Sequence, residues 1–188
     1  MRCVVCECFS FAIICKRCST LLTPTSSIRK IDGVDVYSLY KYKNIKEILH
    51  TKHTPIGYRV YKRLSNLSLK PFMDYFAHIK PLYILGIDEH IQNGYSHIAI
   101  LTHSLKNTNT IIPHSKLMAN NRVKYSGKTL EFRLNNPRNF RYSYKRDIDV
   151  VLVDDIITSG TTIKEAISTL KKYNVNVLFV LTLADANN

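Results

Sequence analysis

The sequence predicts an α/β domain, a largely parallel sheet flanked by helices, with a small cysteine-rich finger at its N-terminus. Three observations support this prediction. Apolar runs typical of buried strands occupy residues 82–87, 150–153 and 175–183. A helical pattern follows the run at 150–153, with Ile163, Ala166, Ile167 and Leu170 spaced i, i+3, i+4 and i+7. All five cysteines of the chain precede residue 19.

The cysteines form two C-x-x-C pairs within residues 1–22, which we predict to be a zinc finger. Cys3 pairs with Cys6, and Cys15 pairs with Cys18. Two such pairs supply four thiolates to a tetrahedral structural zinc and leave no open coordination position. Disulfides are the main alternative, which a reducing cytosol disfavours, and a redox C-x-x-C is another. Cys8 is either a bystander or a competing ligand.

Residues 23–80 are predicted to contain a linker, a strand and a basic helical insert. The linker covers 21–30, because proline, serine and threonine dominate it. Strand-forming residues follow at 33–42 and a helical pattern at 42–52. A second amphipathic helix is expected over 58–69, ended by Pro71, and a third, short one over 72–79.

Residues 81–188 are predicted to form the main α/β domain. After the run at 82–87, a second buried strand is expected at 98–101. The segment 102–106 would then follow the C-terminal end of a parallel strand, where α/β sheets bind ligands. A plain connection is the alternative for this segment.

The most informative stretch is 150–162, where a buried strand runs into Asp154 and Asp155 and then into a polar loop. Gly160 permits a tight turn, and a helix N-terminus favours an anion. Neighbouring hydroxyls can donate to phosphate oxygens, and adjacent carboxylates can bind sugar hydroxyls or a hydrated Mg²⁺. The alternative is a core strand followed by a helix that Ser159 or Thr161 caps, with no ligand. The loop consists of Thr158, Ser159, Gly160, Thr161 and Thr162.

This stretch resembles the signature of the type I phosphoribosyltransferases, which bind 5-phosphoribosyl-1-diphosphate (PRPP) together with Mg²⁺. The resemblance implies that Asp154 and Asp155 hold the ribose 2′ and 3′ hydroxyls and that the loop 158–162 cradles the 5′-phosphate. It also makes 102–106 the candidate for the pyrophosphate loop.

The chain is strongly basic, with a net charge of +13. Residues 102–146 hold ten lysines and arginines against one acid, and residues 41–70 hold eight against one. Such clusters suit PRPP, nucleic acid or an acidic membrane surface, whereas the alternative is a solvated basic surface. The long segment 107–146 carries interleaved aromatics, as in platforms that stack single-stranded bases, and would also suit a flexible hood over the ribose site. Its candidate DNA contacts are Lys124, Lys128, Arg133, Arg138 and Arg141.

The finger, the basic insert and the phosphate signature together resemble the ComF family (ComFC-type) of competence proteins. The stretch 37–42, ten residues before Lys52, and the stretch 133–140 carry further likeness, although the family's usual Val-Pro-Val-Pro and R-G-F-N segments have no counterpart. The resemblance implies binding of incoming single-stranded DNA during natural transformation, beside a helicase-like competence ATPase. An active phosphoribosyltransferase with an unknown nitrogen acceptor is the alternative, and an inactive scaffold is a third hypothesis.

A cytoplasmic location is expected, because no apolar run approaches the roughly 18 residues of a membrane span and no clean signal peptide is present. The ComF resemblance implies a place at the cytoplasmic face of the inner membrane.

Overall fold

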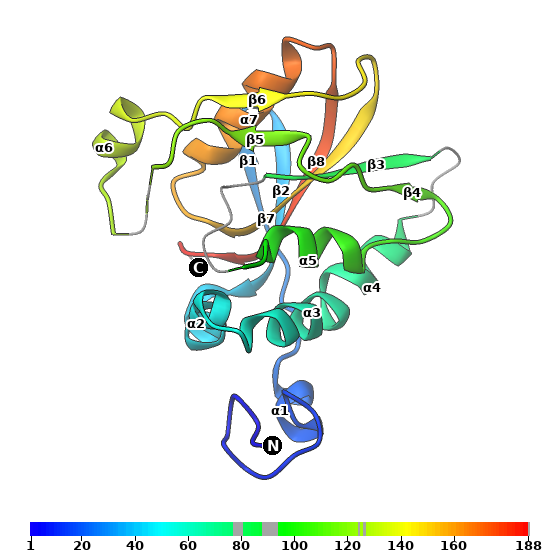
Figure 1. Cartoon of the computed structure of the whole chain (residues 1–188), viewed down its shortest axis with the longest axis vertical. Coiled ribbons are helices and arrows are strands. Elements are labelled where there is room, and N and C mark those ends of the chain that lie inside the picture. Colours follow the sequence, from blue (N-terminus) through cyan, green and yellow to red (C-terminus); the bar gives the residue numbers. More distant parts are fainter. Residues whose placement is uncertain (77–80, 88–93, 124, 126, 188) are drawn as a thin grey trace.

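The computed structural model describes residues 1–76, 81–87, 94–123, 125 and 127–187 of the chain. Its centre is a six-stranded sheet of order β1-β2-β8-β7-β3-β4, in which only β1 is antiparallel to its neighbour (Figure 1). The predicted α/β fold with a largely parallel sheet is therefore confirmed. The strands are β1 (Ser27–Ile31), β2 (Val34–Lys41), β3 (Leu82–Gly86), β4 (Thr110–Ile111), β7 (Asp149–Ile157) and β8 (Asn176–Asp185).

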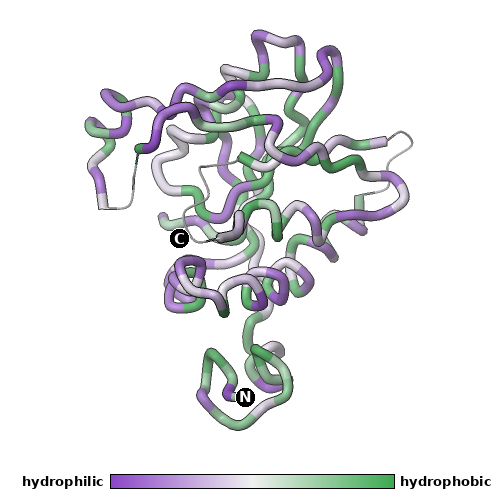
Figure 2. Tube along the Cα trace, in the orientation of Figure 1, coloured by the Kyte–Doolittle hydropathy of each residue, from purple (hydrophilic) through white to green (hydrophobic). Residues whose placement is uncertain are grey.

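Helices cover both faces of the sheet, because the inner strands are apolar on both sides. Along β7, Val151 and Val153 belong to one buried cluster with the helices α2–α5, whereas Val150 and Leu152 belong to a second cluster with α7. Figure 2 shows these strands as a hydrophobic centre within a more polar periphery. The helices are α1 (Lys16–Leu21), α2 (Tyr42–His50), the 3₁₀ turn η1 (Thr51–His53), α3 (Gly57–Leu67), α4 (Leu69–Tyr75), α5 (His97–Ser104), α6 (Leu130–Asn135) and α7 (Thr161–Lys171).

A small antiparallel pair, β5 (Leu117–Ala119) and β6 (Phe140–Tyr142), lies over α7 (Figure 1). We call residues 117–142, which contain β5, α6 and β6, the hood segment. Its attachment to α7 is polar as well as apolar, because the Glu165 carboxylate accepts hydrogen bonds from the backbone N–H groups of Arg138 and Asn139, at 3.0 and 2.5 Å. Lys124, one of the predicted DNA contacts, lies outside the described residues.

Two sequence predictions of local structure are wrong. Residues 98–101 are not a strand but part of α5, whose N-cap Ser96 accepts a hydrogen bond from the backbone N–H of Ala99 at 3.0 Å. A short apolar run is ambiguous between strand and helix, and the preceding serine is the signal that separates the two. Pro71 does not end a helix; it stands in the first turn of α4, where its missing N–H costs little.

The predicted linker 21–30 is partly a strand, because β1 pairs with β2 in a hairpin. Ile31 faces Val34 across a turn made by Asp32 and Gly33, which have φ angles of 52° and 85°. Asp-Gly is a preferred sequence for a two-residue turn with positive φ at both positions. The Asp-Gly dipeptide is therefore a better sequence signal here than the preceding serines and threonines. It indicates the hairpin, whereas they suggest a linker.

The N-terminal finger lies below the helices α2 and α3 in Figure 1. Ile13 and Ile14 of the finger belong to the same buried cluster as the helices α2–α4, and the Arg63 guanidinium of α3 donates to the Ser19 hydroxyl at 3.0 Å. The finger is thus packed on the domain. Among the described residues, no helix has both the length and the apolar character needed to cross a bilayer.

Candidate functional site

The loop after β7 depends on a glycine. Gly160 has φ +82°, in the left-handed region, and is the N-cap residue of α7. A Cβ at this position would lie 2.7 Å from Ile31 Cδ1 of β1, so the end of that side chain would have to shift, and the positive φ would strain any residue other than glycine. The backbone therefore turns from β7 into α7 in a space that only glycine fills without strain.

The hydroxyls of the loop do not cap the helix that follows. Gly160 is the N-cap residue of α7, no side chain of the described residues caps this N-terminus, and the first turn contains no acidic residue. The interpretation in which Ser159 or Thr161 caps the helix is therefore wrong; these two hydroxyls lie 3.1 Å apart and contact each other. A helix N-terminus without a negative partner, surrounded by hydroxyls, is well suited to an anion.

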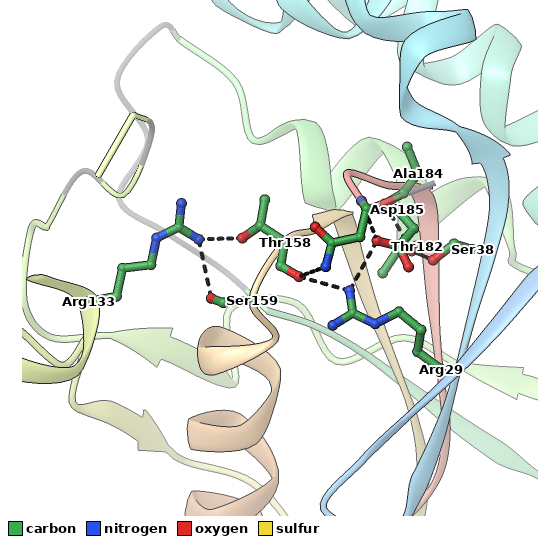
Figure 3. Close-up of polar contacts among 9 residues, drawn as sticks. Arg29, Ser38, Arg133, Thr158, Ser159, Thr182, Ala184 and Asp185 are labelled. Atoms are coloured by element: carbon green, nitrogen blue, oxygen red, sulfur yellow. Dashed lines mark hydrogen bonds and ion pairs between the residues drawn. The ribbon is translucent and has the colours of Figure 1, made fainter. Parts of the chain in front are cut away.

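Two arginines reach Thr158 from opposite sides (Figure 3). Arg29 of β1 donates to the Thr158 carbonyl at 2.8 Å and to the buried Asp185 carboxylate at 3.0 Å. Arg133 of α6 donates to the Thr158 hydroxyl and, at 3.4 Å, to the Ser159 hydroxyl. The predicted phosphate loop is therefore held from the sheet and contacted from the hood segment.

The two acids at the end of β7 have different environments. Asp154 is partly exposed, and one oxygen of its carboxylate accepts a hydrogen bond from the Asp155 backbone N–H at 2.8 Å. Asp155 is only 7% exposed. Its Oδ2 atom lies 2.8 Å from Lys52 Nζ, 3.3 Å from His97 Nε2 and 3.4 Å from the Tyr61 hydroxyl. The structure thus separates two carboxylates to which the sequence assigned one role.

Electrostatics keep Asp155 ionised in spite of its burial. Burial alone would raise the pKa of this carboxyl, but Lys52 and His97 more than offset that effect and hold the pKa well below its usual range. Burial and the neighbouring Asp155 charge raise the pKa of the Tyr61 hydroxyl, which therefore stays protonated and donates. Asp155 is consequently an anion inside the domain, stabilised by groups from η1, α3 and α5.

Sequence reasoning did not find most of this cluster. Lys52 was noted only through a family likeness, and Tyr61 and His97 stand inside stretches that look like ordinary amphipathic helix or buried strand. The backbone around Lys52 is held by Tyr95, whose hydroxyl lies 3.0 Å from the carbonyl oxygens of Lys52 and Thr54. Gly57 allows this arrangement, because a Cβ there would lie 2.1 Å from the Thr51 carbonyl oxygen. The sequence signal that could have indicated this position of Lys52 is the turn-forming run that follows it, Thr54, Pro55 and Gly57.

The predicted DNA contacts are not equivalent in the structure. Lys128 and Arg141 are exposed, and Lys128 Nζ lies 5.1 Å from the centre of the Phe132 ring. Arg138 is 6% exposed and its guanidinium stacks 4.4 Å from the Tyr125 ring centre, so it supports the hood segment from within. Arg133 is directed toward the loop. Of the predicted contacts that the structure describes, Lys128 and Arg141 are therefore the two exposed ones.

The segment 102–106, the candidate pyrophosphate loop, does not occupy the predicted position. Thr102, His103 and Ser104 belong to the last turn of α5, and Leu105 is its C-cap. The segment therefore does not follow the end of a parallel strand. The residues directly after β3 and Ile87, 88–93, lie outside the described part of the chain.

The four predicted zinc ligands come together in the finger. The Sγ atoms of Cys3, Cys6, Cys15 and Cys18 all lie within 4.8 Å of one another, and the Cys6–Cys15 pair is 3.7 Å apart. Tetrahedral zinc with Zn–S bonds of about 2.3 Å requires thiolates roughly 3.8 Å apart, so the donor set fits this ion. Cys8 lies outside the group, although its Sγ is 3.1 Å from that of Cys6.

Comparison with known proteins gives one family match and several distant structural likenesses. Residues 73–188 match the phosphoribosyl transferase domain. No curated protein matches significantly. The fold is similar to adenine phosphoribosyltransferase from Saccharomyces cerevisiae, with 13% identity, a TM-score of 0.45 and coverage of 90% of this chain and 88% of that one.

Two further solved structures show the same level of likeness. Hypoxanthine phosphoribosyltransferase from Staphylococcus aureus has 18% identity and a TM-score of 0.43, over 66% of this chain and 62% of that one. Leishmania donovani UMP synthase has 17% identity and a TM-score of 0.42, over 73% of this chain. The chain spans only 24% of the length of the UMP synthase. Such distant likenesses say nothing of ligand or activity.

Replacing Lys52 with methionine is expected to destabilise the domain in a pH-dependent way. Removing one partner of a fully buried ion pair costs about 3–5 kcal/mol, because the other charge stays buried, and we expect a smaller loss here because the Lys52 side chain is partly exposed. In the parent, the lowered pKa of Asp155 means that the pair contributes fully above the ordinary carboxyl value of 3.8 and is lost only in stronger acid. In the variant only His97 still opposes the effect of burial, so the pKa of Asp155 rises relative to the parent, and the penalty is largest at neutral pH and shrinks as the carboxyl protonates.

Urea unfolding at pH 7 and at about pH 5 measures this difference. Lys46→Met, at an exposed position of α2, is the matched control and should change the free energy of unfolding by less than about 0.5 kcal/mol. A Lys52→Met penalty that is equally large at both pH values would contradict the assignment.

Replacing Cys18 with serine is expected to abolish metal retention, whereas Cys8→Ser should leave it intact. The parent should carry about one zinc per chain, because four clustered thiolates form a closed structural site. Elemental analysis of purified protein gives the zinc content, and thermal unfolding shows whether the finger depends on it. Equal zinc loss in both variants would instead make Cys8 a ligand.

Proposed function

Because the chain belongs to the phosphoribosyl transferase domain family, we propose that it binds PRPP through the loop 158–162, with the 5′-phosphate at the N-terminus of α7. The observation that carries this proposal is the geometry of the loop itself. Gly160 turns the backbone, the loop hydroxyls are free of any capping role in the described structure, and Arg133 adds a positive charge beside Thr158 and Ser159. Together these features favour a phosphate group over a neutral sugar.

Within this proposal, Asp154 and Asp155 have different roles. Asp154, at the partly exposed end of β7, would bind the ribose hydroxyls and help to hold a hydrated Mg²⁺ that accompanies the diphosphate. Asp155 is engaged by Lys52, His97 and Tyr61, so its contribution would be to fix the strand end on which Asp154 stands. Mg²⁺ suits such a site because it takes few protein ligands and keeps water and phosphate oxygens.

An active phosphoribosyltransferase is the alternative within the same family. A nitrogen nucleophile of the acceptor would form a bond to C1 of the ribose as the bond to the diphosphate breaks, and the diphosphate would leave with both electrons of that bond. Release of pyrophosphate in the presence of candidate acceptors separates this activity from binding alone.

The second proposed function is binding of single-stranded DNA in natural transformation, as the ComF likeness implies. The hood segment and the chain after it present basic residues beside aromatic rings: Arg146 lies 5.5 Å from the Tyr173 ring centre, and Lys145 lies 5.6 Å from that of Tyr83. Such pairs combine backbone attraction with surfaces on which bases stack. A cytoplasmic site of action at the inner membrane, beside a helicase-like ATPase, belongs to this proposal.

The PRPP site is tested by calorimetric titration of PRPP with Mg²⁺ into zinc-loaded protein. Asp154→Asn is expected to weaken binding about tenfold or more, because it removes a charged hydrogen-bond acceptor and keeps the shape of the side chain. Asp147→Asn, at an exposed turn before β7, is the matched control and should bind as the parent does. Absence of PRPP binding to the folded parent would refute the proposal.

The DNA surface is tested by the salt dependence of oligonucleotide binding. Replacing Lys128 and Arg141 together with alanine should reduce the slope of log affinity against log salt by about 1.4, because each side chain that neutralises a phosphate of a single strand adds about 0.7 to that slope. Replacing Lys43 and Lys46 of α2, also exposed, is the matched control on another basic cluster. An unchanged slope in the first variant would remove the hood segment from the DNA surface.

A further inference from the structure

Arg133 occupies an unusual position for a residue of a basic surface. It extends from α6 to the loop after β7, where its Nη1 atom donates to the Thr158 and Ser159 hydroxyls (Figure 3). Within the described part of the chain, no carboxylate forms an ion pair with it. Its guanidinium is therefore hydrogen-bonded to neutral groups among the described residues and keeps its charge beside the positive end of a helix dipole.

The hood segment fixes the guanidinium in this orientation. Nε donates to the Lys128 carbonyl at 3.3 Å, and Nη2 donates to the Tyr125 carbonyl at 3.1 Å. The guanidinium carbon also lies 5.5 Å from the centre of the Tyr125 ring. One edge of the planar group is thus bound to the backbone of the hood segment, and the other edge faces the loop.

The contact also determines what the loop hydroxyls can do. Because the Thr158 hydroxyl accepts a hydrogen bond from Arg133, its own proton can be donated to another acceptor. The Ser159 hydroxyl also accepts from Arg133 and shares a hydrogen bond with the Thr161 hydroxyl, so one proton of that pair can be donated to a ligand. The first turn of α7 supplies further backbone N–H groups and contains no acid that would accept from them. An oxyanion at this point would receive hydrogen bonds from the hydroxyls, the helix and Arg133 at once.

We propose that Arg133 is a ligand for the phosphate group bound at the loop 158–162, supplied by the hood segment, and that it selects a phosphate monoester in its dianionic form. This inference rests on the proposed function and adds a specificity-determining residue to it. Arg133 belongs in this assignment to the sugar-phosphate site and not to the exposed surface that would track DNA.

The test is calorimetric titration of ribose 5-phosphate into the full chain at pH 7.5 and 5.5. A phosphate monoester loses one negative charge near pH 6, so the parent should bind more weakly at the lower pH. Arg133→Gln keeps a donor for the hood carbonyls but removes the charge, whereas Arg133→Lys keeps the charge but removes the planar fork. Arg122→Ala, an exposed arginine of the same segment that belongs to neither proposed site, is the control. Near-UV circular dichroism confirms that each variant is folded.

We expect Arg133→Gln to weaken ribose 5-phosphate binding about tenfold or more at pH 7.5 and to flatten its pH dependence. Arg133→Lys should recover part of the affinity and retain the pH dependence. Parent-like affinity in Arg133→Gln would overturn the inference and leave the proposed function standing. Loss of oligonucleotide binding in Arg133→Gln, with ribose 5-phosphate binding unchanged, would return the residue to the DNA surface. A parent that binds neither ribose 5-phosphate nor PRPP would refute the proposed function itself.

Discussion

The ion pair between Lys52 and Asp155 is the interaction on which the arrangement of this domain depends. It joins η1, in the helical layer, to the C-terminal end of β7 just before the loop. His97 of α5 and Tyr61 of α3 contact the same carboxylate oxygen. Charges are removed from water only at considerable cost, so this oxygen fixes the positions of three helical elements relative to β7. The buried Asp155 carboxylate thereby orients the end of β7, and this strand end positions the partly exposed Asp154 and the loop 158–162.

The loop itself is held by a second set of contacts that is independent of the first. Arg29 ties the Thr158 backbone to Asp185 at the end of the neighbouring β8, and the β1–β2 hairpin brings Arg29 into position. Ile31 of the same hairpin fills the space beside Gly160. The antiparallel edge strand β1, although it lies at the end of the sheet order, therefore contacts the loop and supports its backbone. Backbone placement of this kind is what a phosphate site requires, because its N–H groups must point at one spot before the ligand arrives.

The sequence predicted four strands of the sheet (β2, β3, β7 and β8), the cysteine cluster of the finger and the strand–loop–helix turn after β7, because each has a strong local signal. Long β-branched runs indicate buried strands, two cysteine pairs indicate a tetrahedral site, and the acids followed by hydroxyls and glycine mark a strand-to-helix turn. It did not predict α5, because four apolar residues fit a helix as well as a strand until Ser96 is read as a cap. It also assigned one role to Asp154 and Asp155, since their difference arises from Lys52, more than a hundred residues earlier in the chain. Contacts over such separations leave no periodic trace in a single sequence.

The packing of the finger on the helical layer has a consequence for the life of the protein in a cell. Ile13 and Ile14 are buried in the same cluster as Leu39, Leu49 and Leu64 of the main domain, so they are not an independent core. A finger without its ion would withdraw these two side chains and leave an apolar patch on the domain itself. Proteases and chaperones that survey exposed apolar surface act on such patches, and small changes in stability alter abundance several-fold. If the four cysteines hold a metal ion, loss of that ion would therefore lower the amount of the protein.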